Sequence, residues 1–337
     1  MGPLGAIVQV KARDPERIVD DTPEAANRWA ARQVKKATAQ VQGSRREIER
    51  RLKLGENLVA VPERVQHLSP EDREPYALPI RTVEEWPGIV VIDHPKADLD
   101  PDSDCLVLSK RDWLELYQLL GSVSAMIRYA ERVRDSDVSA CLGGELDRYM
   151  EFYKRSATAP NADRANLDVL IHPTEIEERG FWVLNELAGK LWPLDNPIPW
   201  HSPEQYRQIV QFLDEIPPAR RHIIGAGLQD LVAGYAAGGS SRAVIMASKT
   251  SQLSVWCSEE GSWSSLDELS LALAGLTWLR HIEASAARSD LRETLGIALL
   301  RDGDTTLEVF CHIEGQQPVD EDLFAMALAE FGPTPLS

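Results

Sequence analysis

Two polar side chains near the start of the sequence have the spacing of groups that act together on a strand. Gln9 and Lys11 belong to the β-branched run Ile7-Val8-Gln9-Val10-Lys11. Residues two apart on a strand point to the same side of the sheet, so the amide and the ammonium would reach one site together. Basic residues follow in a long helical segment that could hold phosphates. The chemistry that this pattern favours is contact with a phosphodiester.

The long basic helix is predicted directly after this strand. Thr22 and Pro23 form a helix-start signal, and residues 24–53 contain no proline and no glycine except Gly43. Its candidate nucleic-acid contacts are Arg28, Arg32, Lys35, Lys36, Arg45 and Arg46. The alternative is that these side chains form only the solvated face of an amphipathic helix.

Gln9-x-Lys11 and the basic helix after it resemble the later half of the catalytic motif of the PD-(D/E)xK nuclease superfamily. The Mrr-like branch, in which this motif reads (Q/E)-x-K, is the nearest match, and the resemblance covers about the first hundred residues. It implies a restriction-endonuclease-like sheet and magnesium-dependent hydrolysis of DNA. In such a site Gln9 would lie at the metal and Lys11 would be the catalytic lysine near the scissile phosphate.

One feature of that family has no counterpart here, the Asp on the strand before the motif. Residues 1–8 contain no carboxylate, and magnesium takes oxygen ligands among which carboxylates are usual, so the metal ligands are unassigned. We therefore expect a truncated nuclease domain, a remnant that does not cleave alone, or an accidental resemblance. Hydrolysis would need a carboxylate from upstream sequence or a partner chain, unless one of the four nearby carboxylates replaces it, namely Asp14, Asp20, Asp21 or Glu24.

A second candidate for chemistry is Asp93-His94-Pro95, at the end of an apolar run. An Asp beside a His at the end of a strand can support acid-base catalysis or a metal. The same three residues are also an ordinary strand-ending turn, which is the interpretation that we favour. The serine-hydrolase pattern Gly-x-Ser-x-Gly and the phosphate-loop pattern Gly-Lys-Ser/Thr are absent from the sequence.

Charge is divided unevenly along the 337 residues. Residues 1–53 hold 12 Lys or Arg and 7 Asp or Glu, whereas the rest of the chain holds 24 and 46, and the net charge is -17. The molecule as a whole repels DNA and anionic membranes, so any contact with DNA must be local to residues 1–53. The acidic remainder favours a protein partner. Four scattered cysteines, no run of 18 apolar residues and no export signal favour a cytoplasmic protein without membrane contact.

The predicted fold class is α/β followed by α+β. Residues 1–108 should form an incomplete restriction-endonuclease-like mixed sheet, with strands that include 58–61, 80–83 and 89–93. Residues 109–236 should be mainly helical and begin with one helix over 110–134. Residues 238–333 should form an antiparallel-sheet domain in the order hairpin, helix, hairpin, helix, with helices 266–287 and 320–331 on one face.

Two hypotheses about function follow. The first is a nuclease-derived protein that contacts DNA through residues 1–53 and hydrolyses phosphodiesters, with magnesium, only if a carboxylate is supplied. The second is a non-enzymatic interaction or regulatory module that binds proteins through its acidic part. DNA affinity that falls steeply with salt would distinguish the first from the second.

Overall fold

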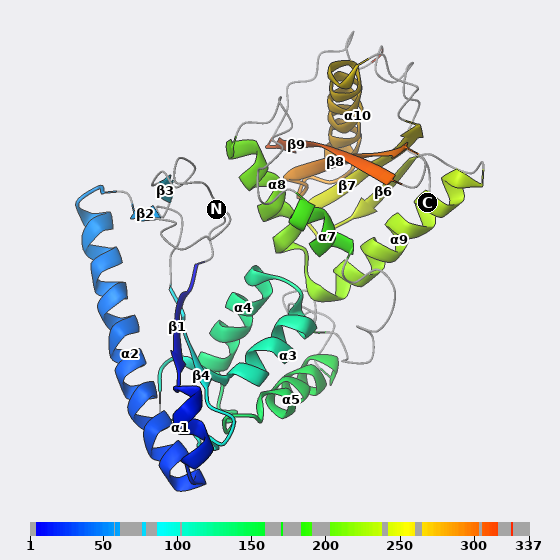
Figure 1. Ribbon diagram of the computed structural model, residues 1–337. Helices are drawn as coiled ribbons and strands as arrows, with labels where there is room; N and C mark the ends of the chain where they lie inside the picture. The colour runs from blue at the N-terminus through cyan, green and yellow to red at the C-terminus, as the bar shows by residue number, and fades with distance from the viewer. Residues whose placement is uncertain are drawn as a thin grey trace. The chain divides into compact units, whose positions relative to one another are not determined.

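The computed structural model describes two compact units, Met1–Leu170 and Ile171–Ser337, which are treated separately below. The described residues are 5–56, 58–60, 76–78, 86–101, 103–158, 170, 183–190, 203–237, 242–259, 265–302, 305–315 and 325. Both units combine helices with a sheet, so the predicted mixture of α/β and α+β structure is confirmed at that level (Figure 1). Within the described part of the chain no helix is long and apolar enough to cross a membrane.

The first unit is built on a small parallel sheet. Its elements are β1 (Ile7–Ala12), α1 (Pro15–Asp20), α2 (Pro23–Lys53), β2 (Leu58–Ala60), β3 (Tyr76–Leu78), β4 (Gly88–Asp93), β5 (Leu106–Ser109), α3 (Lys110–Leu120), α4 (Val123–Arg134) and α5 (Glu145–Thr158). The strands β1, β4 and β5 lie side by side in that order, and both pairings are parallel. The short strands β2 and β3 pair with each other in an antiparallel ladder. A strand expected over 80–83 lies outside the described residues.

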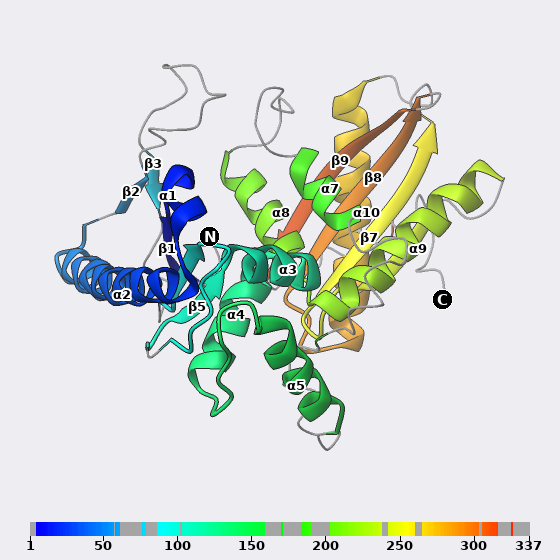
Figure 2. The same ribbon diagram turned by 60° about the horizontal axis from the view of Figure 1, so that its bottom comes forward.

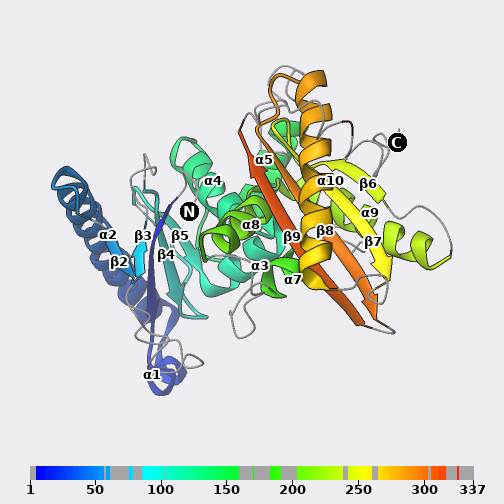
Figure 3. The same ribbon diagram turned by 90° about the horizontal axis from the view of Figure 1, so that it is seen from above.

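Helices cover both faces of this sheet (Figure 3). The helix α2 packs on β1 and β4, while α3 and α4 pack on the other face, against β4 and β5. In the part of the sheet that is described, β1 is an edge strand. Its residues Val8 and Val10 are 42% and 62% exposed on the face away from α2. The sheet is therefore covered on both faces at β4, whereas β1 is covered by α2 on one face and exposed on the other.

The long helix α2 forms for the reasons that its sequence indicates. The hydroxyl of Thr22 accepts a hydrogen bond from the backbone N–H of Ala25 at 3.3 Å, and Pro23 occupies the first turn, where its missing N–H costs nothing. One side of the helix is buried along its length, with Ala26, Trp29, Ala30, Val34, Ala37, Val41 and Ile48 facing the sheet. The predicted helix over 24–53 is confirmed.

The single helix expected over 110–134 is wrong, because two helices meet at Gly121. That residue has a φ of 66°, a left-handed conformation that glycine adopts at little cost, and it ends α3. Ser122 then caps α4 by accepting a hydrogen bond from the N–H of Ala125 at 3.1 Å. The apolar pattern continues through the break, which is why the sequence indicated one helix. Figure 2 shows α3 and α4 as separate helices.

The second unit contains a four-stranded mixed sheet. Its elements are α7 (Val183–Lys190), α8 (Pro203–Glu215), α9 (Pro218–Ala236), β6 (Arg242–Met246), β7 (Ser251–Glu259), α10 (Leu266–Ala287), β8 (Glu293–Asp302) and β9 (Thr305–Glu314). The pairs β6–β7 and β8–β9 are antiparallel, but β7 and β8 are parallel. The expectation of an antiparallel sheet is thus wrong at its centre, since α10 carries the chain across the sheet and returns it in the same direction. The helix expected over 320–331 lies outside the described residues.

Two separate apolar layers enclose this second sheet. Leu269, Leu273 and Leu276 of α10 pack on one face together with Trp256 and Ala298. The opposite face is covered by α7, α8 and α9, whose buried side chains are Leu184, Leu187, Ile209, Phe212, Leu213, Ile224 and Leu228. The helices predicted for a middle region, 109–236, are therefore distributed between the two units, with α3 to α5 in the first and α7 to α9 in the second.

Candidate nucleic-acid interface

The strand β1 brings the two motif residues to one side of the sheet, as the spacing predicts. Gln9 lies beside Val90 and Lys11 beside Ile92 in the parallel ladder, and these odd-numbered positions face α2. The Nζ atom of Lys11 donates to Oε1 of Gln9 at 3.4 Å. It also donates to Oε1 of Gln40, from the middle of α2, at 2.6 Å. A third residue, Gln40, therefore belongs to this cluster.

The donor set of this cluster does not suit a divalent cation by itself. An ammonium and two neutral carboxamides supply no negative charge, and Mg²⁺ binds proteins chiefly through carboxylates. Among the described residues no group of three or more His, Cys, Asp or Glu could hold a metal ion. The nearby Asp14 accepts from the N–H of Glu16 at 3.0 Å, and Asp21 is bound by Arg13 and His94, and within the described residues neither carboxylate bonds to Lys11.

The outward face of α2 is basic. Five of the six predicted contacts are exposed, namely Arg28, Arg32, Lys35, Lys36 and Arg46. At about 100° of rotation per residue, they fall within a sector of roughly 100° opposite the buried side of the helix. Within the part of the chain that the structure describes, none of Arg32, Lys35 and Lys36 forms an ion pair with a carboxylate. Their charges are thus directed toward solvent.

Arg45, the sixth predicted contact, is turned the other way. Its Nε donates to the backbone carbonyl of Trp86 at 2.7 Å, and one of its terminal nitrogens lies 3.5 Å from Asp104. The side chain is half-buried and ties α2 to the segment before β4 and to the one before β5. Arg45 therefore has a structural role in this unit, and its position a quarter turn away from the basic sector is the sequence signal that distinguishes it.

The side chains around His94 close the carboxyl end of β4. The ring of His94 is buried, and its Nε2 lies 3.0 Å from a carboxylate oxygen of Asp21. The backbone N–H of Lys96 donates to Nδ1 at 3.2 Å, which makes Nδ1 the acceptor and places the ring proton of the neutral form on Nε2. Both ring nitrogens are thus engaged within the protein, as in a structural turn.

Asp21 is the charged member of this group. Arg13 binds it through two nitrogens, each 3.1 Å from an oxygen, and packs its guanidinium 5.6 Å from the ring centre of Trp29. The hydrogen bond from His94, followed by the one from Arg13, holds the pKa of the Asp21 carboxyl below its usual value of 3.8. The group fixes the turn between α1 and α2 to the end of the sheet.

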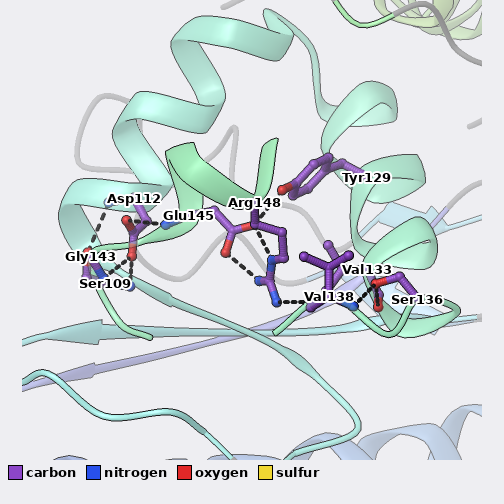
Figure 4. Close-up of polar contacts among 9 residues, drawn as sticks. All are labelled: Ser109, Asp112, Tyr129, Val133, Ser136, Val138, Gly143, Glu145 and Arg148. Carbon is purple, nitrogen blue, oxygen red and sulfur yellow. Dashed lines mark hydrogen bonds and ion pairs between the residues drawn. The ribbon is translucent and has the colours of Figure 1, made fainter. Parts of the chain in front are cut away.

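A buried polar cluster between α3, α4 and α5 contains two further inward carboxylates, those of Asp112 and Glu145 (Figure 4). Asp112 completes a capping box with Ser109 and accepts from the N–H of Gly143 at 2.7 Å. Glu145 accepts from the hydroxyl of Tyr129 at 2.5 Å and from both Nε and a terminal nitrogen of Arg148. Burial, and then the charge of Glu145, raises the pKa of the Tyr129 hydroxyl. The cluster is mutually satisfied and holds three helices together.

Comparison of the chain with protein-family models, with curated proteins and with solved structures finds no match in any of the three. Function is therefore inferred from the residues of β1 and α2 themselves. Sequence reasoning identified Gln9, Lys11 and the basic face of α2, but it missed Gln40. No local motif marks that residue, because it meets Lys11 only through the packing of α2 on β1.

Proposed function

We propose that this protein is a nuclease-derived module that binds DNA through the sugar-phosphate backbone, using the outward face of α2. The observation that carries the proposal is the alignment of exposed basic residues opposite the buried side of one helix. Arg28, Arg32, Lys35, Lys36 and Arg46 are called the outward basic face below. Contacts of this kind position a protein on a duplex without reading its sequence.

The dimensions of α2 suit such a role. At about 1.5 Å per residue, the outward basic face from Arg28 to Arg46 is about 27 Å long, which is most of the roughly 34 Å of one turn of duplex DNA. Duplex DNA carries about one phosphate charge per 1.7 Å of its axis, so several phosphates lie within reach of the face at once. The net charge of -17 repels DNA. At physiological salt, however, screening reduces the effect of charges beyond about 8 Å, so acidic residues far from α2 oppose DNA binding only weakly.

Hydrolysis is a further part of the proposal, and it depends on a carboxylate from a source other than the cluster around Lys11. With such a group, a magnesium ion would have an anionic ligand and Lys11 would lie near the scissile phosphate, as the family resemblance implies. The described residues alone do not support a metal-dependent step.

The test of DNA binding measures affinity for a fluorescent duplex by anisotropy over a range of salt concentrations. The variant Arg28→Gln/Arg32→Gln/Lys35→Gln/Lys36→Gln should bind much more weakly at low salt. If all four side chains contact phosphates, the slope of log affinity against log salt should fall by about 3 to 4, since each contact contributes roughly 0.9.

A matched control removes four positive charges elsewhere in the same unit. Lys110→Gln/Arg111→Gln/Arg134→Gln/Arg155→Gln changes net charge equally, but the residues lie on other helices. It should keep the slope of the unchanged protein. Equal slopes for all three proteins, or no DNA binding at low salt, would reject the proposal and favour the protein-interaction alternative.

One observation supports that alternative, in which the acidic second unit binds a protein. This unit holds 11 Lys or Arg and 24 Asp or Glu. Leu271 lies on the side of α10 away from the sheet and is 77% exposed, next to partly buried apolar residues. Exposed apolar groups of this kind are typical of protein-binding surfaces when they are contiguous.

A further inference from the structure

We infer that Gln9, Lys11 and Gln40 form a binding site for a single oxyanion such as a phosphate group, with Gln40 as the residue that positions Lys11. This site is distinct from the outward basic face, because it lies on the flank of α2 that meets β1. The inference does not depend on DNA binding by the outward face. The proposed ligand is an anion, whereas a magnesium site would bind a cation.

The hydrogen-bonding capacity of the three side chains supports an anion. Lys11 has three N–H donors, and the two carboxamide oxygens take two of them. Because both oxygens are directed at Lys11, the NH₂ groups of Gln9 and Gln40 are the parts of these carboxamides left for another ligand. Neither NH₂ group donates to another residue in the described part of the chain. The cluster thus offers the two NH₂ groups and the third N–H of Lys11 to a ligand, which suits an oxyanion.

Charge and burial point the same way. Within the described residues Lys11 forms no ion pair, so its positive charge is balanced only by neutral amide dipoles. Gln9 and Lys11 are half-buried beside the apolar residue Ile7, while Gln40 is exposed and leaves the site open to solvent. A charge at the edge of an apolar layer attracts an anion more strongly than one in bulk water, because it is less screened.

Gln40 is the residue that fixes this geometry. A lysine side chain has many rotamers, and ordering it costs conformational entropy. The contact between Gln40 and Lys11 spans 29 residues of sequence and is the shorter of the two that Lys11 makes. Gln40 therefore orders the ammonium before an anion arrives.

The test follows the side-chain amide signals of glutamine in the full-length protein by NMR. Inorganic phosphate is titrated at constant ionic strength, and Mn²⁺ is added in a second experiment as a paramagnetic probe for a cation site. We expect phosphate to shift the signals of Gln9 and Gln40, and Mn²⁺ to leave them unbroadened. Broadening by Mn²⁺ without a phosphate shift would establish a cation site and overturn the inference, as would no response to either probe.

Two substitutions identify the role of Gln40. Gln40→Met keeps the length of the side chain but removes its polar atoms, and it should weaken phosphate binding at Gln9 by about tenfold or more. Gln40→Glu should weaken it further, because a carboxylate would neutralise Lys11. Gln42→Met is the control, since Gln42 is an exposed glutamine on another side of the same helix. Equal phosphate affinity in all four proteins would overturn the positioning role.

The same variants separate the two sources of a phosphate group. If the site takes a backbone phosphodiester, Gln40→Met should also weaken binding of a duplex without terminal phosphates. If it takes a phosphate monoester, only duplexes with a 5′-phosphate should distinguish Gln40→Met from the unchanged protein. Loss of DNA binding in the outward-face variant with intact phosphate shifts at Gln9 would show that the two sites are independent.

Discussion

At the scale of single residues, the polar groups of the first unit divide into those that stabilise it and those left for a ligand. The ring nitrogens of His94 and the carboxylates of Asp21 and Glu145 are all engaged by neighbouring groups. Lys11 and the outward basic face are different, because no described carboxylate neutralises Lys11 or the residues Arg32 to Lys36. In this unit, charged groups that are buried or paired stabilise the fold, and those that are not neutralised are the candidates for binding a ligand.

The carboxylate of Asp21 makes the stability of this unit depend on acidity. Its pKa is lower in the folded protein than the unfolded value near 3.8, so the stability that it contributes is fully present above 3.8 and is lost as the pH falls below 3.8 through the lower folded pKa. The urea midpoint of Asp21→Asn should therefore be lower than that of the unchanged protein at pH 7. The difference should shrink below about pH 4.

The control for this prediction is Asp20→Asn, which changes an exposed neighbour that forms no ion pair with the described residues. Its urea midpoint should follow that of the unchanged protein at every pH. A constant difference between Asp21→Asn and the unchanged protein from pH 7 to pH 3 would contradict the role assigned to the Asp21 carboxylate.

At the scale of elements, the structure shows which patterns can be interpreted locally. The strand β4, the helix α2 and the shared face of Gln9 and Lys11 follow from periodicity and capping signals within short segments. The break at Gly121 was missed because the apolar spacing runs through it. The parallel pairing of β7 with β8 was missed because strand order depends on a connection of more than thirty residues, which no local pattern specifies.

The packing of α10 on β8 leads to an element-scale prediction. A Cβ atom at Gly296 would lie 1.9 Å from Oγ1 of Thr277, so the helix cannot approach the strand as closely if a side chain is present. Gly296→Ala should lower the free energy of unfolding by about 1 to 3 kcal/mol. Chemical denaturation measures the effect.

A second substitution tests the cause. Thr277→Ala removes the closest atom and leaves the Cβ contact at 3.0 Å, so the double variant should recover part of the loss relative to Thr277→Ala alone. Gly234→Ala is the comparison, because a Cβ there meets nothing within 4 Å and alanine favours the helix α9. A neutral Gly296→Ala would mean that α10 moves away from the sheet at little cost.

At the scale of the whole molecule, charge is segregated between the units. The second unit carries 24 of the 53 acidic residues but only 11 of the 36 basic ones, and the sequence pI is about 4.9. The chain should therefore bind an anion exchanger at pH 7 and, through the outward basic face, also be retained on heparin at low salt.

Heparin retention should be lost in the variant with Gln at positions 28, 32, 35 and 36, while anion-exchange retention becomes slightly stronger. Salt gradients on the two columns measure both effects. Elution of the unchanged protein in the heparin flow-through at low salt would show that the acidic surface cancels the local basic charge.

The parallel ladder between β1 and β4 also has a consequence for synthesis of the chain. Ile7 pairs with Gly88, so β1 has no partner in β4 until about 80 further residues have been added. At about 5 to 20 residues per second, that interval is roughly 4 to 16 seconds. The helix α2, whose hydrogen bonds are local, can form during this interval. The apolar run that begins at Ile7 stays unpaired until β4 has been made. We expect chaperones that bind nascent chains to contact that run before the sheet forms.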